Sequence, residues 1–356
     1  MTPSAPDGPA RRSRRSFAGT RPVMDDVARR AGVSKQTVSR VLNDHPAVRP
    51  ETREAVREAM RVLGYRPSRS ARSLASGRTR MLGVLSFDAA RYGPAAMLTA
   101  IDAAARDAGY LVGSIALDTA DRNTVAEAVR RLSAEGADGV IAIAPQRWVG
   151  RALADSGPDL PLVVLDDAPE DGAPQVTGDS RDGARRATGH LLALGHRTVF
   201  HLAGPAGWTS ADQRLAGWRA TLEAAGAEVP EPLVGDWSAG SGYELGRRLA
   251  GRPEVTAVFA ANDQMALGLL HALHEAGRAV PGDVSVVGYD DIPEAAFLLP
   301  PLTTVRTDFA EIGTRSLRLL LHRIDRAAEP PRSARPVPAE LVVRRSSGPP
   351  RVSRLP

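Results

Sequence analysis

Residues 24–43 are the stretch that most constrains what this chain can fold into. Two apolar stripes at helical spacing run through the stretch: Val27, Ala28 and Ala31, and then Val38, Val41 and Leu42. Between the stripes, Gly32 can adopt the positive φ of a helix end, and the Ser34 hydroxyl can cap the helix that follows. Two short helices joined by a three-residue turn are typical of a helix-turn-helix.

The outer face of the second predicted helix carries side chains that such a motif uses to read DNA. The residues on this face are Lys35, Gln36, Ser39, Arg40 and Asn43. Glutamine can bind adenine through two hydrogen bonds, and arginine and lysine suit the O6 and N7 atoms of guanine. A solvated polar face is the alternative for an isolated helix. The capped turn before this helix favours DNA binding, and Lys35 adds weight because it is the only lysine in the chain.

Charge is distributed unevenly along the 356 residues. Residues 1–80 contain 18 Lys and Arg against 7 Asp and Glu, a net charge of +11, whereas the remainder contains 28 against 34, a net charge of −6. A basic head on an acidic body favours an anionic polymer as the partner of the head alone. The body is therefore not expected to present a second nucleic-acid face.

Composition also disfavours several classes of site and of location. The chain has no cysteine, which excludes disulfides and cysteine-ligated metals. No apolar run approaches the roughly 20 residues that span a membrane, and the arginine-rich start lacks the apolar segment of a secretory signal. His271 and His274 have helical spacing but no evident third ligand. We therefore expect a cytoplasmic protein that needs no metal or cofactor.

Changes of composition divide the sequence into five segments. We predict a disordered basic tail at 1–20, a helix-turn-helix domain at 21–66 with a third helix from Glu51 to Leu63, a hinge helix or linker at 67–79, a body at 80–345 and a second disordered tail at 346–356. Leu74 is notable because it is apolar and has no apolar partner in its segment. It is either a wedge for a minor-groove base step or a linker leucine that rests on the body.

The body shows the alternation of strands and helices that is typical of doubly wound α/β folds. The predicted strands are Met81–Phe87, Tyr110–Ala116, Gly139–Ala144, Leu160–Leu165, Thr198–Ala203, Ala257–Ala261 and Val284–Tyr289, with a last short strand at Val342 and Val343. This is about twice the number of strands that one such half needs. We therefore expect two similar lobes with a ligand cleft at the carboxyl ends of the strands.

Polar side chains follow several of these strands. Asp166, Asn262 with Asp263, and Asp290 with Asp291 each come directly after a predicted strand, and Arg214 and Trp237 lie on elements that should reach the same cleft. Carboxylates and a guanidinium make charge-assisted hydrogen bonds to adjacent hydroxyls, and an indole covers the apolar face of a sugar ring. The set suits a polyol ligand. The alternative for each aspartate is that it caps the next helix.

Four motifs together resemble those of the LacI/GalR family of bacterial transcriptional regulators. They lie at residues 26–43, 261–268, 286–292 and 301–305, and the resemblance covers residues 22 to about 345. It implies a helix-turn-helix head, a hinge helix that folds only on operator DNA, and a body like a periplasmic sugar-binding protein. It also implies a homodimer joined mainly through the bodies, because the end of the chain lacks the leucine repeat that joins dimers into tetramers.

The resemblance assigns roles to individual residues. Positions Lys35, Gln36 and Arg40 would read bases, and Ala71 and Leu74 would contact DNA from the hinge, with Leu74 entering the central minor-groove step. The effector cleft would contain Phe87, Asp166, Ser210, Arg214, Trp237, Asn262, Asp290 and Phe309. The sequence departs from the family's pattern at two of these positions, where Phe87 replaces a small polar residue and Thr307 replaces a longer amide, and both changes bear on the size and identity of the ligand.

The sequence thus predicts a sequence-specific DNA-binding regulator, a repressor of sugar-utilisation genes, which a sugar such as a galactoside releases from a palindromic operator. A purine or other corepressor is the alternative within the family, since Trp237 can also stack on a base. An exported sugar-binding protein is disfavoured by the basic head and the missing signal. An enzyme is disfavoured because Arg214 near the acidic residues would keep them ionised, and because the glycine pattern at 240–246 does not follow a clear strand.

Overall fold

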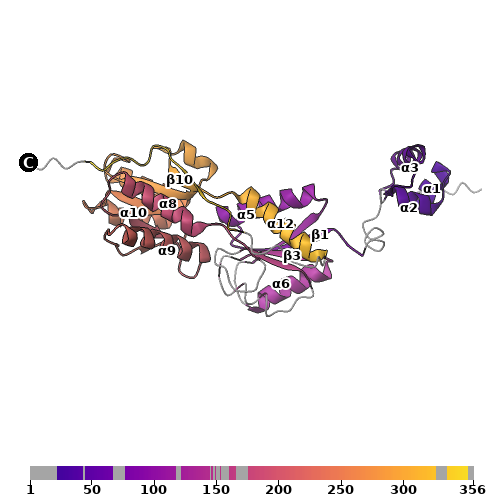
Figure 1. Ribbon diagram of the computed structural model, residues 1–356, viewed down its shortest axis with the longest axis horizontal. Coiled ribbons are helices and arrows are strands. Elements are labelled where there is room, and N and C mark those ends of the chain that lie inside the picture. Colours follow the sequence, from indigo (N-terminus) through magenta and orange to yellow (C-terminus); the bar gives the residue numbers. More distant parts are fainter. Residues whose placement is uncertain are drawn as a thin grey trace, which may run out of the picture. The chain divides into compact units, whose positions relative to one another are not determined.

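The computed structural model describes residues 22–42, 45–66, 77–117, 122–144, 146, 149, 153, 160–165, 175–325 and 335–351. The chain divides after Thr79 into a small helical unit and a larger α/β unit (Figure 1). The predicted contacts of Asn43, Asp166, Ala71 and Leu74 lie outside the described residues. No helix among the described residues is long and apolar enough to cross a membrane.

The helical unit is a helix-turn-helix followed by a third helix, as the sequence predicts. Its helices are α1 (Met24–Ala31), α2 (Lys35–Leu42) and α3 (Pro50–Leu63). Val27, Val38 and Val56, one from each helix, are fully buried in a shared apolar core. Gly32 has a φ of 66°, and the backbone N–H of Thr37 donates to Ser34 Oγ at 3.1 Å. Both turn residues therefore play the local roles expected of them.

The first lobe of the α/β unit, termed the N-terminal lobe, has a parallel sheet of order β2-β1-β3-β4-β5. Its strands are β1 (Met81–Phe87), β2 (Leu111–Leu117), β3 (Gly139–Ile143), β4 (Leu162–Leu165) and β5 (Gln175–Val176). Helices α5 (Tyr92–Asp107) and α12 (Phe309–Ile324) cover one face and share a core with Leu82 and Val84. Helix α6 (Arg122–Ala134) covers the other face, where Leu85 and Phe87 point.

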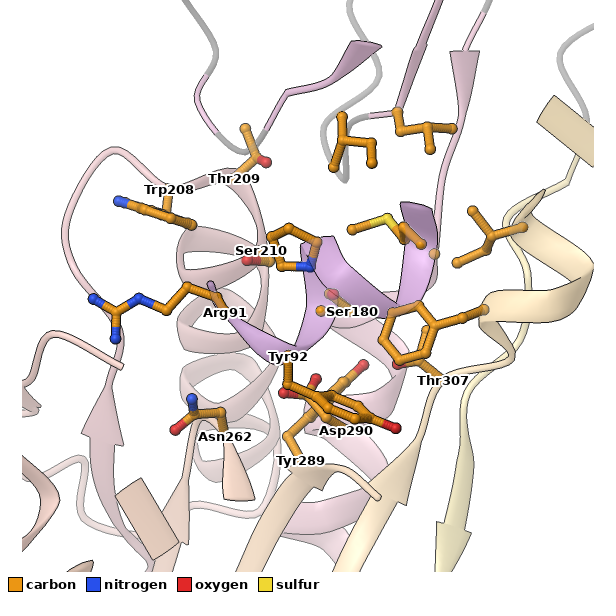
Figure 2. Close-up of a pocket in the computed structure, with 18 of the residues that line it drawn as sticks. Arg91, Tyr92, Ser180, Trp208, Thr209, Ser210, Asn262, Tyr289, Asp290 and Thr307 are labelled. Carbon is orange, nitrogen blue, oxygen red and sulfur yellow. The ribbon is translucent and has the colours of Figure 1, made fainter. Parts of the chain in front are cut away.

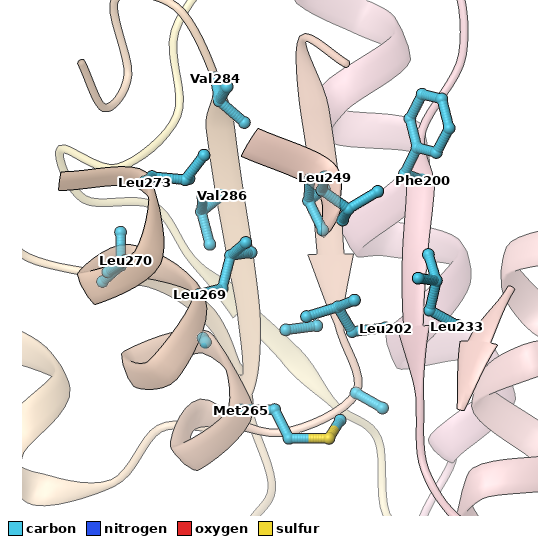
Figure 3. Packing of buried hydrophobic residues seen from close by; sticks show 14 of the residues in the cluster. Phe200, Leu202, Leu233, Leu249, Met265, Leu269, Leu270, Leu273, Val284 and Val286 are labelled. Atoms are coloured by element: carbon cyan, nitrogen blue, oxygen red, sulfur yellow. The ribbon is translucent and has the colours of Figure 1, made fainter. Parts of the chain in front are cut away.

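The second lobe, termed the C-terminal lobe, has a six-stranded sheet of order β11-β10-β9-β8-β6-β7. Its strands are β6 (Phe200–Ala203), β7 (Leu233–Val234), β8 (Ala257–Ala260), β9 (Ser285–Asp290), β10 (Thr303–Arg306) and β11 (Glu340–Val342), and only β11 is antiparallel to its neighbour. Helices α8 (Ser180–Ala193) and α9 (Thr209–Ala224) pack on one face of the sheet. Helices α10 (Ala239–Ala250) and α11 (Asp263–Glu275) pack on the other face, with the leucine-rich core shown in Figure 3.

The chain passes between the lobes three times: from β5 to α8, from β10 to α12, and from α12 to β11. Two of the passages lie side by side, because Gly178 and Val337 form a parallel bridge. The last passage returns the chain to the C-terminal lobe. The body is therefore two lobes joined by several short segments, which is the arrangement expected of a clamp around a ligand.

The C-terminal lobe continues beyond the boundary that the sequence suggested at residue 345. Ser346 is fully buried; it accepts a hydrogen bond from Thr303 N at 2.7 Å and donates one to Val286 O at 2.6 Å. Arg351 pairs with Asp283 at 2.7 Å. The segment 346–351, predicted as the start of a disordered tail, thus belongs to the body, because small hydroxyl side chains fasten it to the edges of β9 and β10.

Candidate functional site

A cavity of about 240 Å³ lies between the two lobes of the body. Figure 2 shows side chains from both lobes around it: Arg91 and Tyr92 come from the N-terminal lobe, and Asn262 and Asp290 come from the C-terminal lobe. Thr307 and Phe309 line it from one of the passages between the lobes. The carboxyl ends of β6, β8 and β9 lead to this cavity, as expected of parallel sheets.

Arg214 and Asp290 form a buried ion pair at the edge of the cavity. Arg214 Nη2 lies 3.2 Å from Asp290 Oδ1, and each residue is only 8% exposed. The guanidinium also donates from Nη1 to the carbonyl oxygen of Ala261, and it stacks 3.6 Å from the centre of the Tyr289 ring. Asp290 has a φ of 104°, outside the usual range for a non-glycine residue. These contacts fix the two charged groups in one arrangement.

A hydrogen bond connects the side chain of Asn262 to the backbone of Trp237. Asn262 Oδ1 accepts from Met265 N at 2.9 Å, which caps α11, and its Nδ2 donates to the carbonyl oxygen of Trp237 at 3.0 Å. Trp237 has a φ of 72°, and the turn around it is stabilised by Ser238 N, which donates to Asp236 Oδ1 at 2.8 Å. Hydrogen bonds from Ser238 lower the pKa of the Asp236 carboxyl to about 2. Asn262 is therefore both a helix cap and a cavity residue.

Aromatic side chains form the apolar walls of the cavity. Trp208 meets Trp237 edge to face with their ring centres 5.8 Å apart, and Tyr92 meets Phe309 in the same way at 5.9 Å. The two pairs come from different parts of the sequence, and all four residues line the cavity. A ligand with apolar faces and polar edges matches walls of this kind combined with the charged and amide groups beside them.

Two aspartates beside the cavity, Asp263 and Asp291, have a different role from their neighbours Asn262 and Asp290. Asp263 is fully buried and accepts hydrogen bonds from Thr304 Oγ1 at 2.6 Å and Ile292 N at 2.9 Å. Burial, with the nearby charge of Asp290, raises the pKa of the Asp263 carboxyl to about 8. These contacts tie α11 to β9 and β10.

Asp291 joins two strands through arginine side chains. It lies 2.7 Å from Arg306 Nε on β10 and 2.6 Å from Arg344 Nη2, just beyond β11. Arg344 Nη1 also donates to the carbonyl oxygen of Leu302 at 2.8 Å. Asp291 thus secures the sheet edge next to the passages between the lobes and is not among the residues that line the cavity.

The structure brings most of the predicted effector residues together. Ser210, Arg214, Trp237, Asn262, Asp290 and Phe309 all line the cavity. Phe87 does not; it is 5% exposed and packs with Leu117 and Val125 under α6. Sequence reasoning missed Arg91, Tyr92 and Trp208. Their signal was weak because they lie at the starts of α5 and α9, several residues beyond the ends of β1 and β6.

The outer face of α2 presents the predicted DNA-reading side chains. Lys35, Gln36 and Arg40 are exposed, and Ser39 is half-buried. Lys35 Nζ lies 3.1 Å from Asp25 Oδ1 on α1. Among the residues that the structure describes, no group of three or more His, Cys, Asp or Glu side chains is placed to hold a metal.

Comparison with known proteins assigns both units. The family model for bacterial regulatory proteins of the lacI family matches residues 23–68, and the model for a periplasmic binding protein-like domain matches residues 188–347. The lactose operon repressor of Escherichia coli K12 is 37% identical over 298 residues, which cover 83% of each chain. The regulator CelR of Thermobifida fusca is 37% identical over 320 residues, covering 85% of this chain and 92% of that protein.

Solved structures agree with these matches. The lac repressor dimer bound to operator and the anti-inducer ONPF has a TM-score of 0.82 at 35% identity, over 92% of this chain and all of that chain. The complex of CelR with cellobiose has a TM-score of 0.69 at 33% identity over the same shares. With a helix-turn-helix head, a two-lobed binding body and relatives of this similarity along most of its length, the chain belongs to the LacI family of bacterial regulatory proteins and is a DNA-binding transcriptional regulator.

Proposed function

We propose that this regulator represses sugar-utilisation genes in the cytoplasm, and that a neutral sugar, with galactosides as the first candidates, releases it from a palindromic operator. The observation that carries the proposal is the cavity between the lobes, where the buried pair of Arg214 and Asp290 faces walls of Trp208, Trp237 and Phe309. It combines fixed hydrogen-bonding groups with aromatic surfaces in one enclosed space.

A sugar can bind both the fixed hydrogen-bonding groups and the aromatic surfaces of the cavity. Each of its hydroxyls can both donate and accept, and a carboxylate and a guanidinium held 3.2 Å apart can bind two adjacent hydroxyls at once. Its C–H faces pack against indole and phenyl rings. The two charges of the pair cancel, and this favours a neutral ligand over an ionic one. A purine would use the stacking surfaces and could offer the charged pair hydrogen bonds from one edge only, whereas a sugar offers hydroxyls around its whole ring.

Release of the operator follows from differential binding to two lobe arrangements. The cavity is lined from both lobes and from the passages that join them, so a ligand that contacts both lobes selects one angle between them. The sugar must bind that arrangement better than the arrangement that fits DNA. Coupling between two such sites is commonly about 1 to 3 kcal/mol, which corresponds to a 5- to 150-fold change in operator affinity.

A homodimer accounts for an exposed apolar surface on the C-terminal lobe. Phe297 is 84% exposed and Leu299 is 92% exposed, in the segment that follows β9. Large apolar side chains that are this open are typical of a surface that a partner covers. Two heads in a symmetric dimer would read the two halves of a palindrome about one helical turn apart.

Calorimetric titration of the full chain with a panel of galactosides, glucosides, cellobiose and purines tests the ligand assignment. We expect one sugar to bind with heat and the purines to give none. If only a purine binds, the sugar assignment is wrong and the effector is a purine corepressor. A footprint of the regulator on its operator that lacks dyad symmetry would contradict the proposed dimeric mode of binding.

A further inference from the structure

Lys35 and Asp25 form an ion pair at the start of the two helices of the helix-turn-helix. Lys35 Nζ lies 3.1 Å from Asp25 Oδ1 and donates to Asp25 Oδ2 at 3.2 Å. Asp25 is in the first turn of α1 and Lys35 is the first residue of α2, and the left-handed turn at Gly32 brings the two helix starts together. The motif therefore presents a cationic donor and an anionic acceptor side by side.

The ion pair contributes little to the stability of the fold. The side chains of Lys35 and Asp25 are 62% and 55% exposed, and water and salt screen such a pair. Arginine supplies all the other side chains of the Lys and Arg type in the sequence, so a lysine here is a departure from the chain's own composition. Lysine offers a compact ammonium with three donors, whereas arginine offers a planar fork. The chemistry of the pair points to recognition.

We propose that Asp25 and Lys35 together read one G·C base pair in each half-site. The inference rests on the proposed function, in which the start of α2 enters the major groove. There guanine displays two acceptors, N7 and O6, and cytosine displays the N4 donor beside O6. The ammonium matches the acceptors and the carboxylate matches the donor. The spacing of 3.1 Å within the ion pair is also that of a hydrogen bond, such as the one that joins O6 to N4.

The other base pairs match the adjacent ammonium and carboxylate less well. In an A·T pair lysine finds only single acceptors, on either side of the adenine N6 donor, and the thymine methyl group fills the space beside O4. In a reversed pair the carboxylate of Asp25 would face guanine N7 and O6, which leaves acceptors opposite each other without a proton. Lys35 thus supplies attraction to the correct pair, and Asp25 supplies repulsion from the reversed one.

Selection of operators from DNA with randomised half-sites, using the full chain, tests the proposal. For wild type we expect one position in each half-site where G·C is preferred by about 5- to 150-fold over the other pairs. Asp25→Ala and Lys35→Ala should each lose that preference, at the same position, and keep the others. Asp25→Ala should lose discrimination mainly against the reversed pair.

Glu58→Gln is the matched control, because Glu58 is an exposed carboxylate of the same unit whose partner is Arg61 on α3. It removes the same charge and should leave every base preference unchanged. A uniform gain in affinity for all sequences in Asp25→Ala would mean that Asp25 only repels phosphates, and this would overturn the proposal. So would a loss at different positions in the two variants. If the wild-type selection gives no sequence motif at all, the chain is not a sequence-specific DNA-binding regulator. The proposed function is then wrong, and this inference is wrong as well.

The single lysine also allows a test on the unaltered protein. The primary amines that acetic anhydride can label are those of Lys35 and the N-terminus, and peptide mass spectrometry separates their products from each other and from acetylated tyrosine. We expect the selected operator to protect Lys35 at least tenfold more than an operator in which the assigned G·C pair is replaced by A·T. Equal protection by both DNAs would place the Lys35 ammonium on phosphates and would contradict the proposal, even if Asp25→Ala failed to fold.

Discussion

Arg214 Nη2 lies 3.2 Å from Asp290 Oδ1, and both residues are more than nine-tenths buried beside the cavity between the lobes. A charge in such a place is tolerated because its partner is present, and removal of one partner leaves the other uncompensated. The pair is supported by the Ala261 carbonyl oxygen and by the Tyr289 ring. Its geometry therefore depends on the shape of the guanidinium as well as on its charge.

Arg214→Lys tests that dependence on shape. Lysine keeps the charge but cannot bind Ala261 and Asp290 together while it stacks flat on Tyr289. We expect the affinity for the effector to fall at least tenfold and the free energy of unfolding to fall by about 1 to 3 kcal/mol. Calorimetry and urea unfolding measure the two quantities. Arg247→Lys, at an exposed ion pair with Glu244, should change neither, and an equal effect of both variants would refute the role given to Arg214.

Gly204→Ala tests the packing behind Trp237. A Cβ at residue 204 would lie 2.2 Å from Trp237 Cη2, so the indole must move from its place in the wall. Forced packing of this kind costs about 1 to 3 kcal/mol of stability, and the displaced ring should weaken effector binding. Gly189→Ala is the control, because a Cβ there meets no atom within 4 Å and the residue lies within α8. Unchanged effector affinity in Gly204→Ala would show that the Trp237 ring is not part of the binding surface.

Much of this architecture follows from local patterns in the sequence. The helix-turn-helix is readable because each of its parts, the apolar stripes, Gly32 and Ser34, acts within a few residues. The longer strands are readable from apolar runs, and residues at their ends, such as Asn262 and Asp290, reach the cavity as expected. Strands β5, β7 and β10 were not predicted, because β5 and β7 have only two residues each and β10, with the sequence Thr-Thr-Val-Arg, has no apolar run.

What the sequence could not supply is the contact between distant segments. Tyr92 and Phe309 are neighbours only because α12 returns to the N-terminal lobe. Phe87 has the position along its strand that suits a cleft residue, yet the alternation of the strand turns it toward α6. Sequence also cannot separate Asn262 from Asp263, or Asp290 from Asp291. One of each pair lines the cavity, and the other fastens the sheet.

Asp263 gives a prediction about pH. Its pKa is about 8 in the folded protein, above the ordinary value of 3.8. Between these values the folded state binds one proton more than the unfolded chain, so the contribution of Asp263 lowers the free energy of unfolding as pH rises. The slope is at most about 1.4 kcal/mol per pH unit. Asp263→Asn should remove this slope in urea unfolding between pH 5 and 7.5.

The exposed pair of Asp102 and Arg106 supplies the control for that measurement. Asp102→Asn removes one acidic side chain from an exposed surface and so controls for the loss of a carboxylate as such. If the curves of Asp263→Asn and the wild type are parallel, Asp263 does not carry an extra proton in the folded protein.

Leu299→Asp tests the proposed dimer surface. Leu299 is 92% exposed, so the substitution should leave the fold intact while placing a charge where the partner must pack. We expect a monomer in analytical ultracentrifugation and a steep loss of operator affinity, since one head makes half of the phosphate and base contacts. Val234→Asp, 59% exposed on the opposite edge of the sheet, should remain dimeric. If Leu299→Asp remains dimeric, the dimer interface does not include the surface around Leu299.

Operator affinity with and without sugar, measured for the wild type and for Asp290→Asn, tests the central claim most directly. Asparagine has the size of aspartate and tolerates the positive φ of this position, but it lacks the charge that strengthens hydrogen bonds to sugar hydroxyls. The account predicts that one sugar of a galactoside and glucoside panel lowers wild-type affinity by about 5- to 150-fold. It also predicts that Asp290→Asn, although less stable because the Arg214 charge is left uncompensated, still binds operator as the wild type does and does not respond. Wild-type affinity that no sugar changes, or a variant that responds as the wild type does, would contradict it.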